Sequence, residues 1–205
     1  MNRKIRQFLF ILCFLLLVSI ASAACAAWGT YPSFPNTFML NGEEHLFPCE
    51  LYAFIIDEWE TYDIQTNDYL QPYEEFAGDE ERDLYLQKEN QRIYIKLKNQ
   101  IEHELPIEDC DVMEICVSSY SFSPFDTPDI EFFGIRPGMN RKKLPAWLRK
   151  EGDFTADGVN YHVISGIGNS MLMMFSEEND YEGSIYYSWN EEGNIDYFCI
   201  SMDSL

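Results

Sequence analysis

The chain has 205 residues, with 14 Lys and Arg against 35 Asp and Glu, a formal net charge of −21, six cysteines and an aromatic content of 16%. This aromatic content is typical of a folded globular protein and not of a disordered chain. The negative charge argues against nucleic acid and anionic lipid as partners, because both are bound through Lys and Arg beside phosphate groups.

The first 23 residues have the layout of a secretory signal peptide. The basic start MNRKIRQ precedes an apolar run from Phe8 to Ile20, and Ala21-Ser22-Ala23 offers a small-residue cleavage site. The run is shorter than the roughly 20 residues of a membrane span, so an uncleaved anchor is the rival interpretation. Both interpretations predict an exported protein, either secreted or anchored on the outer face of the cytoplasmic membrane.

A second cleavage site competes with the first. Ser22-Ala23-Ala24-Cys25 resembles a bacterial lipoprotein sequence, although Ser22 stands where an aliphatic residue is usual. Cys25 is therefore a lipidation candidate, and free secretion and lipid anchoring stay open. Membrane contact is expected only through a lipidated Cys25 or an uncleaved signal. Residues 24–36, with one Gly and two Pro, are interpreted as a tether.

The segment 37–129 predicts two hairpins, a short helix and a central strand. Asn41-Gly42 between two short apolar segments is a hairpin signal, and Leu84 to Gln87 with Arg92 to Leu97 predicts the second hairpin. The spacing of apolar residues within Glu50 to Asp57 favours a helix. Cys110 to Ser118 alternates as a strand.

The segment 130–205 predicts a strand, a helix and a set of antiparallel strands. The strand covers Ile130 to Ile135, and the helix follows it, with Asn140 as a candidate N-cap and Gly152 as its end. Pro145 conflicts with a helix interior, so a helix that begins at Leu144 with Pro145 at N1 is the alternative. The later strands are expected at Asn160 to Ser165, Met171 to Phe175, Ser184 to Trp189 and Ile195 to Met202.

The predicted fold class is α+β, with two small lobes, 37–129 and 130–205. Each lobe is expected to pack one short helix on an antiparallel sheet.

The cysteines predict disulfides in the exported protein. If Cys25 is lipidated or free, Cys49, Cys110, Cys116 and Cys199 can form two bridges in three possible pairings. Cys110 and Cys116 share one strand about 20 Å apart, which is too far for a bridge between them. The preferred pairing is Cys49–Cys110 with Cys116–Cys199, and the spacings do not match a zinc site.

The stretch FGIRPGMNRKKLPAWLRKEGDF resembles the strand–turn–helix that opens SmpA/OmlA-type and β-lactamase-inhibitor-protein-like domains. Gly134, Ile135, Gly138 and Met139 match the motif, and Asn140 replaces its usual Ser or Thr. The first half resembles a module of bacterial exported lipoproteins, at the positions Gly42, Pro48, Cys49, Trp59, Asn99, Asp109, Cys110 and Val112, with Glu58 in place of a Gly. The resemblance implies a scaffold whose characterised members bind other proteins.

No catalytic arrangement is evident in the sequence. His45, His103 and His162 lie far from any nucleophile motif or metal spacing, and we expect them to be surface or strand-pair residues. Weak calcium binding by the acidic loop residues Asp79, Glu80, Glu81 and Asp83 stays open. No cofactor is expected.

An aromatic surplus on the last strands provides the candidate binding surface. Alternation puts Tyr187 and Trp189 on one face of a strand and Tyr186 on the other, and ordinary cross-strand packing is the alternative to a binding role. We expect a non-catalytic binding protein that recognises a basic protein or envelope component through the C-terminal sheet and its acidic rim. A cell-wall or glycan binder using Tyr187 and Trp189 is the alternative, and a hydrolase with paired carboxylates is the second.

Overall fold

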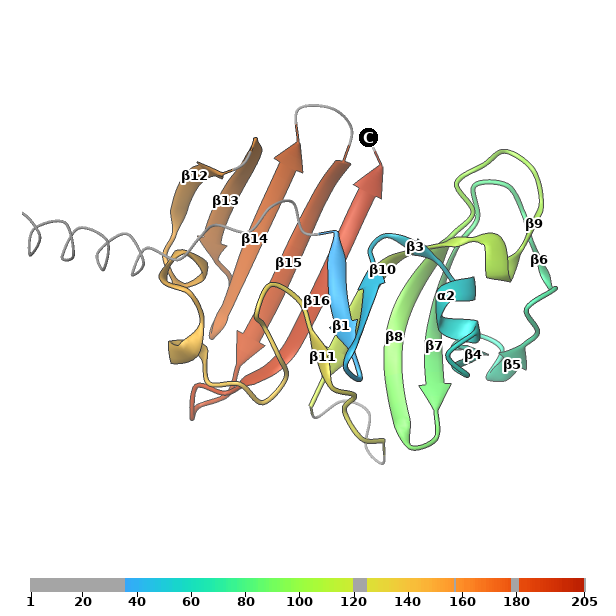
Figure 1. Cartoon of the computed structure of the whole chain (residues 1–205), viewed down its shortest axis with the longest axis horizontal. Coiled ribbons are helices and arrows are strands. Elements are labelled where there is room, and N and C mark those ends of the chain that lie inside the picture. Colours follow the sequence, from blue (N-terminus) through green and yellow to red (C-terminus); the bar gives the residue numbers. More distant parts are fainter. Residues whose placement is uncertain (1–35, 120–124, 157, 178–180, 205) are drawn as a thin grey trace, which may run out of the picture. The chain divides into compact units, whose positions relative to one another are not determined.

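One large antiparallel sheet organises the part of the chain that the computed structural model describes, residues 36–119, 125–156, 158–177 and 181–204 (Figure 1). Each strand pairs antiparallel with its neighbours, and β3 (Cys49–Glu50) joins the sheet by pairing with β10. In spatial order the other strands are β12 (Gly152–Ala156), β13 (Val159–Ser165), β14 (Ser170–Glu177), β15 (Tyr181–Trp189), β16 (Ile195–Ser204), β10 (Asp111–Ser118), β8 (Gln91–Lys98), β7 (Glu81–Lys88), β4 (Glu60–Asp63) and β5 (Asp68–Leu70).

The remaining elements are short. They are two small sheets, one of β11 (Ile130–Glu131), β1 (Thr37–Leu40) and β2 (Glu43–Leu46) and one of β6 (Glu75–Phe76) and β9 (Leu105–Pro106), the helix α2 (Tyr52–Ile55), and the 3₁₀ helices η1 (Ile107–Asp109), η2 (Arg141–Lys143) and η3 (Ala146–Arg149). Among the described residues no helix is long and apolar enough to cross a membrane.

One face of the large sheet packs against the core of the protein. Alternate residues of β8, namely Ile93, Ile95 and Leu97, have no exposed surface, and Leu84 and Leu86 of β7 oppose them. This alternation arises because successive side chains of a strand point to opposite faces. We call the face that carries these residues the inner face.

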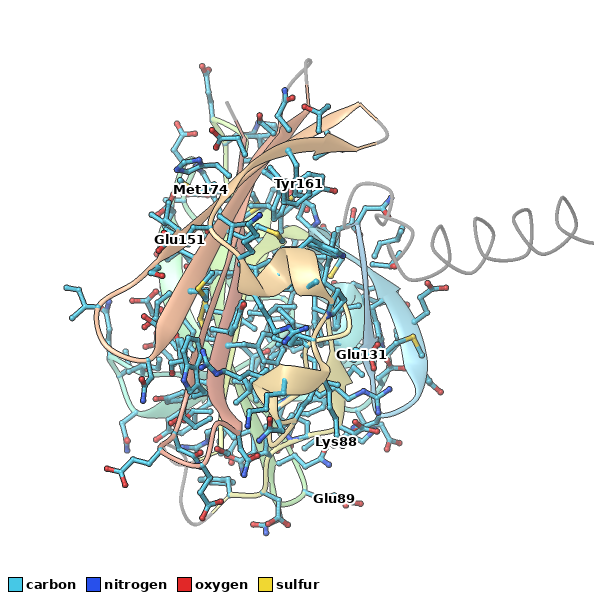
Figure 2. All side chains as sticks on the ribbon, turned by 90° about the vertical axis from the view of Figure 1, so that its left-hand side faces the viewer. Lys88, Glu89, Glu131, Glu151, Tyr161 and Met174 are labelled. Atoms are coloured by element: carbon cyan, nitrogen blue, oxygen red, sulfur yellow. A yellow bond between two sulfur atoms is a disulfide. The ribbon has the colours of Figure 1, made fainter. Side chains whose placement is uncertain are left out.

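The short elements cover the inner face. Tyr187 of β15 donates a hydrogen bond to the carbonyl of Leu148 in η3, and Trp147 of η3 lies 6.3 Å from the ring of Tyr161 on β13. Near the other end of the sheet, Phe76 of β6 stacks with Arg82 of β7. Figure 2 shows Met174 projecting from the sheet on the side opposite to Tyr161. We call this second side the uncovered face, because the contacts of the short elements given above are all on the inner face.

Two of the hairpins predicted from the sequence are confirmed. β1 and β2 flank Asn41-Gly42, and both turn residues have the positive φ that a tight hairpin turn requires. β7 and β8 pair over their full length. The strands expected at 160–165, 171–175, 184–189 and 195–202 are all present with longer bounds.

The helix predicted after Asn140 is wrong. Asn140 does cap η2, since its side chain accepts a hydrogen bond from the Lys142 amide, but Leu144 is extended and a separate helix, η3, follows Pro145. A residue before proline is pushed out of the helical region, and proline lacks the amide that would continue the helix. The segment therefore splits into two single turns of 3₁₀ helix.

The predicted α+β class is also wrong. Strands dominate the described residues, and the helical segments have three or four residues each. The short helix expected in each half is thus too small to form a layer on a sheet, and the protein is β-rich. The sheet runs continuously from the first predicted segment to the second, because β10 pairs with β16.

Candidate functional site

A row of tyrosines crosses the uncovered face of the sheet. Tyr69 on β5 lies directly opposite Tyr62 on β4, and Tyr62 lies opposite Tyr85 on β7. Tyr85 in turn lies opposite Tyr94 on β8. We call these four residues the tyrosine row. Directly opposed residues on one face have neighbouring side chains, so the row forms one continuous surface.

The same line continues through the disulfide in the middle of the sheet. Tyr94 lies opposite Cys116, Cys116 lies opposite Cys199, and Cys199 lies opposite Tyr186 on β15. The ring of Tyr186 contacts the ring of Tyr197 on β16 with centroids 5.8 Å apart. Tyrosines from both halves of the chain therefore share one line of the sheet.

The rings of the tyrosine row are held in place but stay accessible. Tyr69 is 45% exposed, and Tyr62, Tyr85 and Tyr94 are half-buried. Tyr62 meets Tyr69 at 5.3 Å and Tyr85 meets Tyr94 at 6.2 Å, both in edge-on geometry. Such pairs are favourable beyond the surface they bury, so the row is ordered before any partner arrives.

Arg92 fixes the row from the neighbouring position on β8. Its guanidinium lies 4.8 Å from the ring centre of Tyr85, 5.5 Å from that of Tyr62 and 3.7 Å from that of Phe125. It also donates a hydrogen bond of 2.8 Å to the side chain of Gln87. A cation over a ring is attracted by the negative ring face, so Arg92 joins rings from three segments.

Two phenol groups of this face, those of Tyr94 and Tyr197, stay protonated. Burial raises the pKa of Tyr94, and the hydrogen bond of 2.7 Å from its hydroxyl to Asp83 raises it further. Burial also raises the pKa of Tyr197, with Glu114 adding to the effect. Both hydroxyls are therefore neutral hydrogen-bonding groups at any ordinary pH.

Acidic side chains outnumber basic ones around the row. Strand register puts the following carboxylates on the uncovered face: Glu50, Glu60, Glu81, Asp83, Asp111, Glu114 and Asp153. The Lys and Arg residues that register puts there are Arg92, Lys96 and Lys98, and Lys98 pairs with Glu81 at 3.1 Å. The described part of this face thus has a negative balance.

A groove lies at the β12 end of the sheet. It has a volume of about 620 Å³, and side chains of the uncovered face that line it are Asp153, Thr155, Asn160, His162, Leu172, Met174, Ser176 and Ser184. Asp153 contacts Nδ1 of His162, and the Thr155 hydroxyl donates to Asn160 at 2.9 Å. Most of these groups are polar, and Met174 gives the groove an exposed apolar floor.

The predicted binding residues divide between core and edge. Tyr187 is 1% exposed and faces the inner side, so its proposed surface role is wrong. Trp189 is partly exposed, contacts the Tyr187 ring at 6.1 Å and lies under the guanidinium of Arg141 at 4.2 Å. Tyr186 and Tyr187 lie on opposite faces of β15, as the alternation predicts, but Tyr186 is the one that faces outward.

The four disulfide candidates behave as two different pairs. Cys116 and Cys199 are bonded, with their Cα atoms 4.0 Å apart on paired strands. Cys49 and Cys110 are free thiols in the structure. Cys49 lies opposite Val112, two residues beyond Cys110, and such diagonal positions are about 7–8 Å apart, at the limit of a disulfide. The lipidation candidate Cys25, with the predicted signal peptide and tether, lies outside the described residues.

The acidic loop residues do not converge on one point. Glu80 contacts Arg82, Glu81 pairs with Lys98, and Asp83 accepts a hydrogen bond from Tyr94. Burial acts to raise the pKa of Glu80, but hydrogen bonds from Arg82 and the Ala77 amide outweigh it and lower that pKa. Glu80, Glu81 and Asp83 thus each have a separate protein partner.

In two groups of described side chains, three possible metal-ligand atoms lie within 4.8 Å of one another. One is Glu114 with Cys116 and Cys199, whose sulfur atoms are used in the disulfide. The other is Glu43 and His45 of β2 with Asp57. The sequence does not reveal the second group, because Asp57 is distant from Glu43 and His45 along the chain. The turn after α2 brings Asp57 beside them in the folded protein.

Comparison of the chain with protein-family models, curated proteins and solved structures finds no match. The family resemblance of the two halves therefore stays a prediction.

Proposed function

We propose that the protein is a non-catalytic binding protein and that its partner is a protein with a basic surface. The observation that supports this proposal is the uncovered face, on which the tyrosine row crosses four strands. Tyrosine and arginine are enriched where proteins bind one another, and a face left without a covering layer offers the area that such an interface needs.

The charge of the face supports a basic partner. Carboxylates surround the tyrosine row, and the whole chain carries a formal net charge of −21. Opposite charges increase the rate of association and fix the orientation of the partners. The phenol hydroxyls of Tyr94 and Tyr197 add hydrogen-bonding groups between the rings.

The test compares two double variants of the protein in capture experiments. Tyr85→Ser with Tyr94→Ser removes the centre of the tyrosine row. The matched control is Tyr52→Ser with Tyr73→Ser, because these tyrosines are 50% and 73% exposed but lie outside the row. The immobilised proteins are exposed to envelope and medium fractions of the source organism and washed at low and high salt.

The expected result is one protein that the original chain and the control retain at low salt and release at high salt. The variant of the row should retain little of it, because the aromatic anchors of an interface supply most of its binding energy. Thermal unfolding of each variant shows whether the sheet is intact. Equal capture by an intact row variant and by the control would contradict the proposal.

A glycan is the second candidate ligand, and the groove at the β12 end favours it. Its polar lining from Asp153, Asn160 and His162 can bond to hydroxyl groups, and Met174 can pack against a sugar ring. Calorimetry with soluble cell-wall polysaccharide tests this candidate. Binding that Asn160→Ala abolishes and the row variant leaves intact would favour the glycan over the protein partner.

A further inference from the structure

The β1–β2 hairpin carries two ligand-type side chains on one of its sides. Glu43 and His45 are two residues apart on β2, so they point to the same side of the hairpin. Leu40 lies opposite Glu43 and Phe38 lies opposite His45, and both of these apolar residues are 2% exposed. The side of the hairpin that carries Glu43 and His45 is therefore the packed side.

The His45 imidazole packs in a cluster with two aromatic rings, Phe38 and Phe54, which also contact each other at 6.0 Å. It stacks on Phe38 at 5.1 Å with an interplanar angle of 21°, and on Phe54 of α2 at 5.9 Å with an angle of 4°. The side chain is 9% exposed. An imidazole packed against two buried rings loses little further freedom on binding a ligand, so its ring nitrogen is fixed in position.

Asp57 completes a set of three ligand atoms. Its Oδ2 lies 3.6 Å from Nε2 of His45, and the ligand atoms of Glu43, His45 and Asp57 all lie within 4.8 Å of one another. Two ligand atoms of one tetrahedral Zn²⁺ lie about 3.4 Å apart, given bonds of about 2.1 Å. A rotation of the exposed Glu43 side chain is enough to close this difference.

A cavity opens beside these three residues. It has a volume of about 250 Å³, and Leu40, Asn41, Trp59 and Lys88 complete its lining. A single ion with a bound water fits into this space. The cavity also places Trp59 where its fluorescence can report on an ion.

Lys88 is the one positively charged residue of the cavity lining, and its charge repels a cation. Its Nζ donates a hydrogen bond of 2.5 Å to the main-chain carbonyl of Asp57, which leaves the carboxylate of Asp57 available. The positive charge of Lys88 offsets one of the two carboxylates. It lowers the affinity for a cation, and its removal should raise that affinity.

We propose that Glu43, His45 and Asp57 bind a divalent transition-metal ion, with Zn²⁺ as the probe and water as the remaining ligand. One imidazole nitrogen with two carboxylate oxygens is a ligand set that zinc accepts, and three protein ligands leave one position of its tetrahedron open. The ion joins the β1–β2 hairpin to the turn after α2. This proposal does not depend on the binding partner of the uncovered face.

The test is a titration of the whole protein with Zn²⁺ by calorimetry and with Co²⁺ by visible absorption and Trp quenching. One ion per chain is expected, and His45→Gln, Glu43→Gln and Asp57→Asn should each weaken binding at least tenfold. Glu43→Gln is the safest of these variants for folding, because Glu43 is exposed. Lys88→Met should bind more tightly than the original chain.

The matched control is His162→Gln, because His162 also contacts an aspartate, Asp153, but forms no described three-ligand group. A second control, Cys49→Ala with Cys110→Ala, removes the free thiols as rival ligands. Both controls should bind Zn²⁺ as the original chain does, and Zn²⁺ should raise their melting temperature but not that of Glu43→Gln. No saturable binding, or binding that survives in folded Glu43→Gln and Asp57→Asn, would overturn the proposal.

Discussion

Tyr186 and Tyr187 show how one position along a strand separates surface from core. Tyr187 is 1% exposed and its hydroxyl bonds to the carbonyl of Leu148, whereas Tyr186 faces outward beside Tyr197. The period of two in a strand assigns the two rings to opposite faces. It does not say which face another part of the chain will cover, and for that reason the surface role was assigned to the wrong tyrosine.

The hydrogen bond of Tyr187 should be measurable. Tyr187→Phe keeps the ring and removes the buried hydroxyl, and we expect the free energy of unfolding to fall by about 1 kcal/mol. Tyr186→Phe is the matched control and should change it little, because Tyr186 is partly exposed. Urea unfolding followed by circular dichroism measures both. Equal midpoints for the two variants would show that the bond adds nothing to stability.

The free thiols make stability depend on alkaline pH. Burial raises the pKa of Cys49 to about 12 and that of Cys110 to about 11, with Asp111 adding to both, from a value of 9.0 without these effects. At a pH between 9.0 and these raised pKa values, the unfolded chain loses thiol protons that the folded chain keeps. The free energy of unfolding should therefore fall as the pH rises from about 9 to 12.

The variant Cys49→Ala isolates this effect. The original chain should lose more stability than Cys49→Ala between pH 8 and pH 11, since only the original has the Cys49 thiol to ionise on unfolding. In the folded protein at pH 8 the thiol should also resist iodoacetamide, because the thiolate is the reactive form. Rapid alkylation of Cys49 in the native state would contradict the assigned burial.

At the scale of elements, β10 is the strand that joins the two halves of the chain. It pairs with β8 on one side and with β16 and β3 on the other, and its residues are buried on both faces over most of its length. The Cys116–Cys199 disulfide crosses from β10 to β16 between residues 83 apart in sequence. The disulfide thus links the two halves of the chain covalently at the point where they meet in the sheet.

Removing this disulfide should cost substantial stability. Cys116→Ala with Cys199→Ala frees a long loop in the unfolded chain, and we expect the free energy of unfolding to fall by about 2–4 kcal/mol. Dithiothreitol should lower the melting temperature of the original chain towards that of the variant and leave the variant unchanged. Peptide mapping without reduction should show the Cys116–Cys199 fragment, and a Cys49–Cys110 fragment would restore the pairing that the structure lacks.

At the scale of the whole molecule, charge is the dominant feature. The formal net charge of −21 acts against compaction, because like charges repel one another over the surface. Local ion pairs such as Lys98 with Glu81 at 3.1 Å compensate only part of it.

Salt should therefore stabilise the protein. We expect the melting temperature to rise between about 10 mM and 150 mM NaCl, as the screening length falls from about 30 Å to about 8 Å, and to change less above that range. A series of thermal scans in NaCl measures this effect. A melting temperature that falls over the same range would mean that attractive ion pairs outweigh the net repulsion.

The sequence by itself determined the local structure of the chain. The two hairpins and the C-terminal strands follow from turn residues and from alternation over a few positions, and those signals act between neighbours in sequence. The helix predicted from Asn140 failed at Pro145, and the alternative start beside Pro145 lies closer to η3, which follows that proline.

Only the tertiary structure decided the candidate sites. Tyr69, Tyr62, Tyr85 and Tyr94 align because β5, β4, β7 and β8 are neighbours in register, and Tyr186 joins them through pairings between strands far apart in the chain. Asp57 reaches Glu43 and His45 in the same way, through packing of α2 on the hairpin. Strand order and the covered face are set by the sum of many long-range contacts, and no short segment of sequence contains that information.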